Sequence, residues 1–427
     1  MTTAVILLFI GLIILLLINV PISISLGLAS LGFILLATED SPVVVAQKLF
    51  GTMEHTTLLA IPFFILSSHF LTTGGVSARL IEFAKALVGW MHGGLAMAAV
   101  VSCMLFAAIS GSSPATVVAI GSIMIPGMIK AGYDKHYTVG VVATAGSMGI
   151  LIPPSIPMIV YADAVEESVG KMFIAGIIPG ILMGILLMTV TWVVARWHKM
   201  PRDQWQGFKH LFKTFLHAFW GLLLIVIVVG GIYGGIFTPT EAAAVAAVYS
   251  AFIALFIHRD MMPKDIPKVM LDSSKMTAVI MFIIACAMIF AHTLTEEQLP
   301  QNLATAVLDH EPSPWVFLLM VNVILWFAGD FMEPSSILLI LAPLFHPIAV
   351  DLGIDPIHLG VIMTTNMEVG MITPPVGLNL YVAAGLTGMS LGQVTKAALP
   401  WMFVMIVALL IVTYVPWLSL FLVNLLY

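Results

Sequence analysis

The sequence predicts an all-α polytopic membrane protein made of two inverted repeats with re-entrant hairpins and broken helices. Its 427 residues are 60% hydrophobic and only 9% charged, and the mean hydropathy is +1.10. Soluble domains carry about 25% charged residues, so a chain this apolar needs the bilayer as its solvent. Runs of about 18 or more apolar residues recur and predict membrane helices. The two halves of the chain also match each other at a fixed offset.

Proline and glycine divide the apolar sequence into helices. No Lys or Arg precedes the first run, which is followed at once by Pro21 and more apolar sequence, so we expect a membrane helix rather than a secretory signal. Another span ends at Gly74-Gly75, and a later one is broken at Pro239. The apolar blocks cover residues 4–20, 22–37, 57–73, 93–195, 218–257 and 276–427.

The composition excludes several classes of protein. The net charge is −6 and there is no basic patch, which argues against nucleic-acid binding. Cys103 and Cys286 lie singly in apolar stretches and predict neither a disulfide framework nor a metal motif. The SGSSPA string is not the G-x-S-x-G of a serine hydrolase, and no H-E-x-x-H occurs, so an intramembrane enzyme is disfavoured.

The distribution of basic residues predicts the orientation in the membrane. The loop 196–213 carries five Lys or Arg residues against the single Asp203, which places it in the cytoplasm. The block 218–257 is long enough to cross the membrane twice, so the loop 259–275 should return to the cytoplasmic side. The acidic-leaning loop 38–56, with Glu39 and Asp40, is then periplasmic. An N-terminus in the periplasm follows.

The internal repeat has an offset of 221 residues. GILIPPSIPMIVYA in the first half corresponds to GMITPPVGLNLYVA in the second, and shared Gly, Pro, Asp and Thr positions extend the match. Loops 38–56 and 259–275 correspond but are expected on opposite sides, which makes the repeats inverted. Inverted repeats with broken helices are typical of transporters whose site lies at the midplane. The matched residues are Pro126/Pro347, Gly132/Gly353, Asp134/Asp355, Thr144/Thr365, Gly149/Gly370, Pro153-Pro154/Pro374-Pro375 and Pro179/Pro400.

Each repeat contains two stretches that should interrupt a helix. Residues 110–116 and 329–336 read as the tips of re-entrant hairpins, and residues 149–155 and 370–375 as unwound breaks. Proline removes backbone donors and ends the preceding helix. The freed carbonyls need protein, water or a cation. Carbonyls and hydroxyls together suit Na⁺, and helix N-termini beyond the breaks suit a carboxylate substrate.

Acidic residues inside the membrane are functional candidates, because burying their charge is costly. Asp330 and Glu333 lie in the second hairpin, where the first hairpin has serines. Glu368 and Asn366 precede the second break. For these residues, ion binding and a structural hydrogen bond remain open alternatives, whereas His346 is expected to be a packing residue.

These motifs resemble the large membrane subunit of the tripartite ATP-independent periplasmic (TRAP) transporters, in their C4-dicarboxylate branch. The resemblance covers nearly the whole chain. It is carried by ISGSSPATVVAIGSIMIPGM (109–128), GILIPPSIPMIVY (149–161), GGIFTPTEAAAVAAVY (234–249), GDFMEPSSILLILAPL (329–344) and GMITPPVGLNLYVAAG (370–385). Sialic-acid members of the family are expected to have an arginine near the position of Glu296. The acidic side chain found there argues against a sialic-acid substrate.

The resemblance implies an elevator-type secondary transporter of the bacterial inner membrane. Its expected partners are a small four-helix membrane subunit and a periplasmic substrate-binding protein. Uptake of an organic acid, such as succinate, malate or fumarate, would be driven by co-transported Na⁺, since no P-loop is present. By resemblance the first sodium site comprises Ser110, Ser112, Gly149, Ile152 and Pro154. By repeat symmetry the second comprises Glu333, Gly370, Thr373 and Pro375.

The remaining polar side chains at the tips and breaks are the predicted substrate contacts: Ser113, Thr116, Ser155, Asp330, Ser335, Ser336, Asn366 and Asn379. The expected first repeat, 1–213, comprises a scaffold arm 1–90, a transport-domain half 91–195 and the loop 196–213. The second, 214–427, comprises a scaffold arm 214–300 and a transport-domain half 301–427. Two alternatives stay open: a TRAP permease for another carboxylate, such as a sialic or sugar acid, and a stand-alone ion or oxyanion antiporter.

Overall fold

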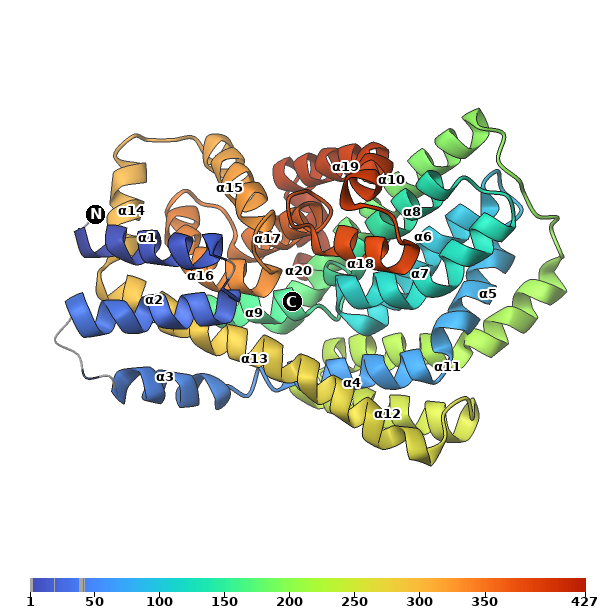
Figure 1. Cartoon of the computed structure of the whole chain (residues 1–427), viewed down its shortest axis with the longest axis horizontal. Helices are drawn as coiled ribbons and strands as arrows, with labels where there is room; N and C mark the ends of the chain where they lie inside the picture. The colour runs from blue at the N-terminus through green and yellow to red at the C-terminus, as the bar shows by residue number, and fades with distance from the viewer. Residues whose placement is uncertain (1–2, 19, 38–40, 42) are drawn as a thin grey trace.

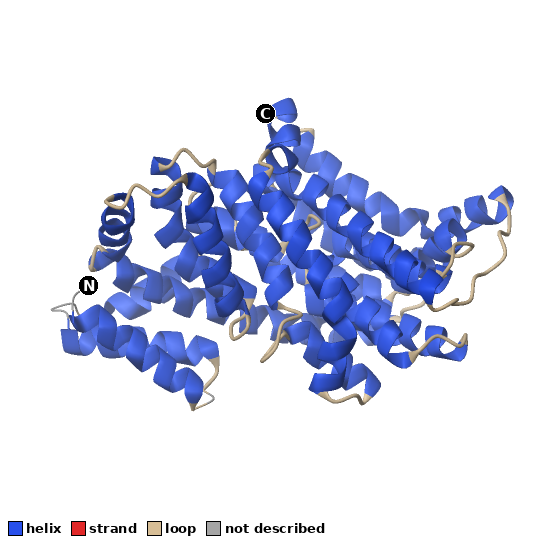
Figure 2. Cartoon of the chain, turned by 90° about the horizontal axis from the view of Figure 1, so that it is seen from above, coloured by secondary structure: helices blue, strands red, loops and turns tan. Residues whose placement is uncertain are grey.

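A computed structural model describes residues 3–18, 20–37, 41 and 43–427, and no strand occurs among them (Figure 2). Seven of the described helices are long and apolar enough to cross a membrane, or eight if the bent pair α4–α5 is one span. The predicted fold class, an all-α polytopic membrane protein of two inverted repeats, is confirmed.

The N-terminal arm contains five helices, and part of it differs from expectation. The expected loop 38–56 contains a helix that packs against α13, with the apolar Val44, Val45 and Leu49 half-buried on it; Glu39 and Asp40 lie outside the described residues. Helices α2 and α4 also pack against α13 (Figure 1). The helices are α1 (Thr3–Leu17), α2 (Ile22–Ala37), α3 (Val43–Met53), α4 (Ala60–Thr73) and α5 (Val76–Val88).

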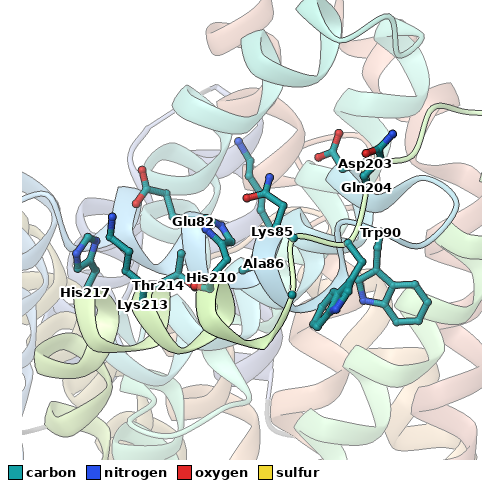
Figure 3. Close-up of a pocket in the computed structure, with 13 residues that line it drawn as sticks. Glu82, Lys85, Ala86, Trp90, Asp203, Gln204, His210, Lys213, Thr214 and His217 are labelled. Atoms are coloured by element: carbon teal, nitrogen blue, oxygen red, sulfur yellow. The ribbon is translucent and has the colours of Figure 1, made fainter.

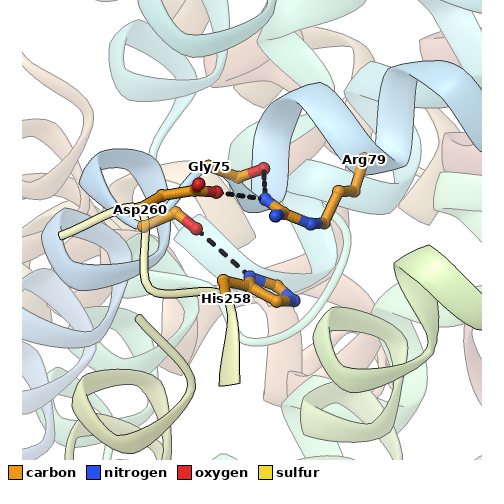
Figure 4. A network of polar contacts seen from close by, with 5 residues as sticks. Gly75, Arg79, His258 and Asp260 are labelled. Atoms are coloured by element: carbon orange, nitrogen blue, oxygen red, sulfur yellow. Dashed lines mark hydrogen bonds and ion pairs between the residues drawn. The ribbon is translucent and has the colours of Figure 1, made fainter. Parts of the chain in front are cut away.

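The chain bends by 70° between α4 and α5, at the glycine pair that the sequence marked as the end of a span. Gly75 has φ +69°, a conformation that favours glycine. Arg79 on α5 donates hydrogen bonds to Gly75 O at 2.9 Å and to the carboxylate of Asp260 (Figure 4). The His258 Nδ1–H donates to Gly74 O at 3.2 Å. The loop after α12 therefore fixes the bend of the first arm.

The second arm has longer helices and shorter loops than expected. Helix α10 reaches Trp197 and α11 begins at Phe208, so only residues 198–207 of the loop 196–213 are non-helical. The loop 259–275 is likewise shortened, since α13 begins at Ile266. Membrane helices can extend past the hydrocarbon and carry their basic residues on helix ends. The elements are α11 (Phe208–Tyr233), α12 (Pro239–Phe252), the π-helix η2 (Ile253–Ile257), the 3₁₀-helix η3 (Pro263–Asp265) and α13 (Ile266–Glu296). Helix α14 (Leu299–Leu308) follows at the expected boundary of this arm and packs on α16.

The two hairpin-and-break units have the same order of elements. Corresponding helices begin 220 to 222 residues apart. The first unit comprises α6 (Gly94–Ser110), α7 (Ser113–Lys130), α8 (Lys135–Ala145), the 3₁₀-helix η1 (Gly146–Ile150), α9 (Ile156–Ala164) and α10 (Val169–Trp197). The second comprises α15 (Pro314–Gly329), α16 (Pro334–Asp351), α17 (Pro356–Gly370), α18 (Leu378–Thr387) and α19 (Leu391–Tyr414), followed by α20 (Trp417–Leu426).

The two units interlock reciprocally. The short helix after the first break, α9, packs on the second hairpin helix α16, and the corresponding α18 packs on α7 of the first hairpin (Figure 1). Helices α8 and α19 also pack together, as do α10 and α17. Such exchange is expected of two copies related by a twofold axis, and it brings both hairpin tips and both breaks to the centre of the molecule.

Candidate functional site

The first hairpin tip is a tight turn held by its own hydroxyls. Helix α6 ends at Ser110, and Gly111 follows with φ +63°. The hydroxyls of Ser110 and Thr116 lie 2.9 Å apart, and the Thr116 hydroxyl donates to Ser112 O at 2.8 Å. These contacts keep the Ser112 carbonyl at the tip while α7 begins at Ser113.

The first break lies directly against this tip. A Cβ at Gly149 would lie 2.6 Å from Ser112 O and 2.8 Å from the Thr116 hydroxyl, so only glycine permits this approach. A Cβ at Gly111 would lie 2.8 Å from Pro154 O, and Ile156 N donates to Gly111 O at 3.4 Å. The structure therefore brings together Ser110, Ser112, Gly149 and Pro154, four of the five residues predicted for the first sodium site.

Ile152, the fifth of these residues, has its side chain directed elsewhere. A Cβ at Gly180 on α10 would lie 2.7 Å from Ile152 Cγ1, so the Ile152 side chain packs on α10. Any contribution of Ile152 to an ion site would have to come from its backbone carbonyl. Ser155, predicted to contact substrate, instead caps α9: its hydroxyl donates to Ile150 O and accepts from Met158 N at 3.3 Å.

The second hairpin tip is organised by a carboxylate. Glu333 precedes α16 and caps it: Ser335 Oγ donates to Oε1 at 2.9 Å, and Ser336 N donates to Oε2 at 3.2 Å. The carbonyl of Asp330 accepts from Val376 N, beyond the second break, at 3.1 Å. The Asp330 Oδ1 atom is buried without a hydrogen-bond partner, whereas the Ser336 side chain lies against the Glu333 carboxylate. A buried carboxylate oxygen with no partner is costly, which makes Asp330 the polar group at this tip that most needs a ligand.

The second tip also touches the second break. A Cβ at Gly370 would lie 2.8 Å from the Cα of Gly329, which repeats the close approach seen in the first unit. The Thr373 hydroxyl donates to Val369 O at 2.7 Å and accepts from Trp326 Nε1 at 3.3 Å. One difference separates the units: Pro153 and Pro154 are buried, whereas Pro374 and Pro375 are exposed. The first break is therefore buried, and the second reaches the surface of the chain.

Two predicted asparagines have different surroundings. Asn379 on α18 donates across the repeats to Ser113 Oγ at 2.6 Å, so it ties the second unit to the first hairpin tip. Asn366 instead donates to the Asn322 carbonyl and side-chain oxygens, both at 2.9 Å, in the packing of α15 against α17. Nearby on α17, Glu368 is fully buried, and neither carboxyl oxygen has a hydrogen-bond partner.

A cavity of about 270 Å³ separates the two tips from α13. Four helices, α7, α9, α16 and α18, begin at residues that line it: Ser113, Ile156, Pro334 and Leu378. Of the predicted site residues, Ser112, Ser113, Glu333 and Ser335 line this cavity. The others do not: Ser110, Thr116, Gly149, Ile152, Pro154, Ser155, Asp330, Ser336, Asn366, Gly370, Thr373, Pro375 and Asn379.

The opposite wall of this cavity comes from α13, which sequence reasoning did not identify. Met276, Val279, Ile280 and Ile283 supply it. These residues lie at the start of the long apolar run that follows Lys275, so no local signal distinguishes them from the rest of that run. In the described part of the chain, no three His, Cys, Asp or Glu residues are grouped to hold a metal ion. An ion would therefore rely on carbonyls, hydroxyls and single carboxylates.

Comparison with known proteins relates this arrangement to transporters. Residues 9–418 match the family described as "Tripartite ATP-independent periplasmic transporter, DctM component". The chain is 60% identical over 400 residues to the C4-dicarboxylate TRAP transporter large permease protein DctM of Pseudomonas aeruginosa, covering 94% of each chain. It is 55% identical to the protein of the same name from Vibrio cholerae, covering 99% of this chain and 98% of that one. Among solved structures, the Alcanivorax borkumensis YdaH transporter has a similar fold, with a TM-score of 0.60 at 17% identity over 96% of this chain and 97% of that one.

Proposed function

Because the chain belongs to the DctM family of tripartite ATP-independent periplasmic transporters, we propose that it is the large permease subunit of a sodium-driven importer of C4-dicarboxylates. Membership makes the chain a transporter permease and not an enzyme. The observation that carries the proposal is the cavity between the hairpin tips, where four helices begin. The relatives' printed substrate supports the dicarboxylate class.

The cavity suits a small dianion. Helix N-termini carry unpaired N–H groups and the positive ends of their dipoles, and both favour carboxylates. A volume of about 270 Å³ lies at the small end of ligand pockets, which argues for a few-carbon acid such as succinate, malate or fumarate over a larger sugar acid. The serines at the two tips would orient the carboxylates, and the apolar wall of α13 would cover the carbon chain.

Sodium would bind where the tips meet the breaks. In the first unit, Ser112 O and Pro154 O lie within a few ångströms of the glycines that permit their approach, and the Ser110 hydroxyl is adjacent. In the second unit, Glu333 adds a negative charge beside the cavity. A carboxylate there would repel a dicarboxylate unless a cation lay between them, because like charges in a low-dielectric site repel strongly. This repulsion gives a physical reason for coupling substrate binding to Na⁺.

The contacts between the two hairpin units differ from the wall that α13 presents to them, and this difference fits an elevator motion. Hydrogen bonds such as that from Asn379 to Ser113 connect the two hairpin units, so that they can move together as one rigid body. Against α13, by contrast, the cavity wall is formed by Met and aliphatic side chains. A body sliding along an apolar wall breaks few hydrogen bonds. We therefore propose that the hairpin units, residues 91–195 and 301–427, move against a scaffold of residues 1–90 and 214–300.

The proposal includes partners and location. A small four-helix membrane subunit would complete the scaffold, and a periplasmic binding protein would deliver the substrate, as the tripartite architecture of the family suggests. The chain is a multi-pass membrane protein, and we place it in the bacterial inner membrane. The basic segment 196–213 would face the cytoplasm and the N-terminus the periplasm.

Uptake of labelled succinate tests the proposal. The chain and its small subunit are reconstituted in proteoliposomes, with and without the binding protein and an inward sodium gradient. We expect uptake only when both are present. Uptake that ignores the binding protein would instead indicate a stand-alone carrier or antiporter. Uptake of a sialic or sugar acid, with none of succinate, malate or fumarate, would overturn the substrate class and leave the fold intact.

A further inference from the structure

A second cavity, of about 410 Å³, lies between α5, the linker 198–207 and the first turns of α11, away from the hairpin tips (Figure 3). The linker is held in place by hydrogen bonds: Asp203 N donates to Gly89 O at 3.1 Å, and Gly93 N donates to Pro201 O at 3.3 Å. The Tyr133 hydroxyl also donates to Pro201 O, at 2.8 Å. The linker wall of the cavity is therefore held by backbone hydrogen bonds to the rest of the chain.

Four charged side chains line this cavity. Lys85 and Glu82 come from α5, Lys213 from α11 and Asp203 from the linker, and Figure 3 shows them around the same space. None of these four forms an ion pair with another described residue. Two unpaired ammonium groups and two unpaired carboxylates thus surround one cavity, with His210 and His217 beside the lysines.

The cavity lies where the membrane surface is expected. The 26 residues of α11 span about 39 Å, roughly 9 Å more than a hydrocarbon core. The first turns of α11 carry basic and aromatic side chains, and they are the part of the helix expected to project beyond the hydrocarbon core. Trp90 and Trp205 border the cavity with ring centroids 6.1 Å apart, and Phe208 and Phe212 are exposed beside them. Exposed aromatic rings next to lysines are typical of the headgroup level of a bilayer.

We propose that this cavity binds the headgroup of a phospholipid that carries a phosphate and a primary ammonium, as in phosphatidylethanolamine. The two lysines match the phosphate, and the two carboxylates match the ammonium. A quaternary ammonium cannot donate hydrogen bonds to Glu82 and Asp203, and a purely anionic headgroup would leave both carboxylates unpaired and repelled. The exposed aromatic side chains contact the acyl chains, which distinguishes a lipid from a soluble phosphate.

Lipid binding to the full chain tests this proposal. The detergent-purified chain is freed of lipid and titrated with phosphatidylethanolamine, phosphatidylcholine or phosphatidylglycerol of identical acyl chains, and bound lipid is counted by native mass spectrometry. We expect phosphatidylethanolamine to bind at least about tenfold more tightly than the other two, because only it satisfies all four charges. Equal binding of the three lipids would overturn the proposal.

Paired variants locate the site. K85Q/K213Q should weaken phosphatidylethanolamine binding roughly 25-fold, from about fivefold per lysine near a headgroup. E82Q/D203N should remove the preference over phosphatidylcholine. The control K264Q/K268Q, two exposed lysines at the start of α13 and the turn before it, should change nothing. An equal loss in the control, or full competition by inorganic phosphate at the lipid's concentration, would overturn the proposal. Because all six side chains lie at the surface or its edge, folding is checked by the thermal midpoint.

Discussion

The contact between Gly149 and the first hairpin tip gives the sharpest prediction. In Gly149→Ala, the new Cβ would lie 2.6 Å from Ser112 O and 2.8 Å from Ser112 C. Both atoms are backbone, so the tip itself must shift by several tenths of an ångström. Forcing an extra carbon into a packed site costs about 1–3 kcal/mol. If the closed tip forms the sodium site, its affinity for sodium should fall roughly 5- to 150-fold.

The assay is sodium-dependent uptake in proteoliposomes, measured as rate against sodium concentration. Gly149→Ala should raise the sodium concentration needed for half-maximal uptake by about 5- to 150-fold. Gly127→Ala is the matched control, because Gly127 lies in the same hairpin and a Cβ there meets nothing within 4 Å. Equal protein yield of the two variants would separate a site defect from misfolding. If both variants show the same sodium dependence as the wild type, the assignment of this contact to ion binding is wrong.

Three further predictions concern stability, pH and topology. Asn379→Ala removes the bond to Ser113 and should cost about 1–3 kcal/mol, seen as a lower thermal midpoint than that of the exposed control Asn302→Ala; equal midpoints would contradict a cross-repeat tie. Burial, and secondarily the nearby Arg79, lower the pKa of His258 below its usual 6.5. The folded chain therefore binds this proton less readily than the unfolded chain, so stability should fall as the pH drops below about 6.5. His258→Gln should lessen this acid sensitivity relative to His310→Gln, and an unchanged midpoint–pH curve would refute the reasoning. A cysteine at exposed Gln206 should react with an impermeant thiol reagent only from the cytoplasm, and labelling from the periplasm would reverse the proposed orientation.

The sequence alone determined the breaks in the helices. Gly111 and the proline pairs act through local backbone chemistry, so the hairpin tips and unwound segments lie where glycine and proline predicted them. The apolar composition and the repeat likewise depend on residue type and spacing. The loops were predicted less well: α3 and the ends of α10, α11 and α13 are helical because packing and the bilayer surface, and not local polarity, decide where those helices end.

Only the tertiary structure decided which residues face one another. Asn379 meets Ser113 across 266 residues, and Asn366 turns away from the tips toward Asn322. The α13 wall of the cavity and the difference between the buried first break and the exposed second break carry no local signal either. An apolar helix in an apolar chain can pack on any face that fits. Which face it uses depends on the whole set of neighbouring surfaces, and these exist only once the chain has folded.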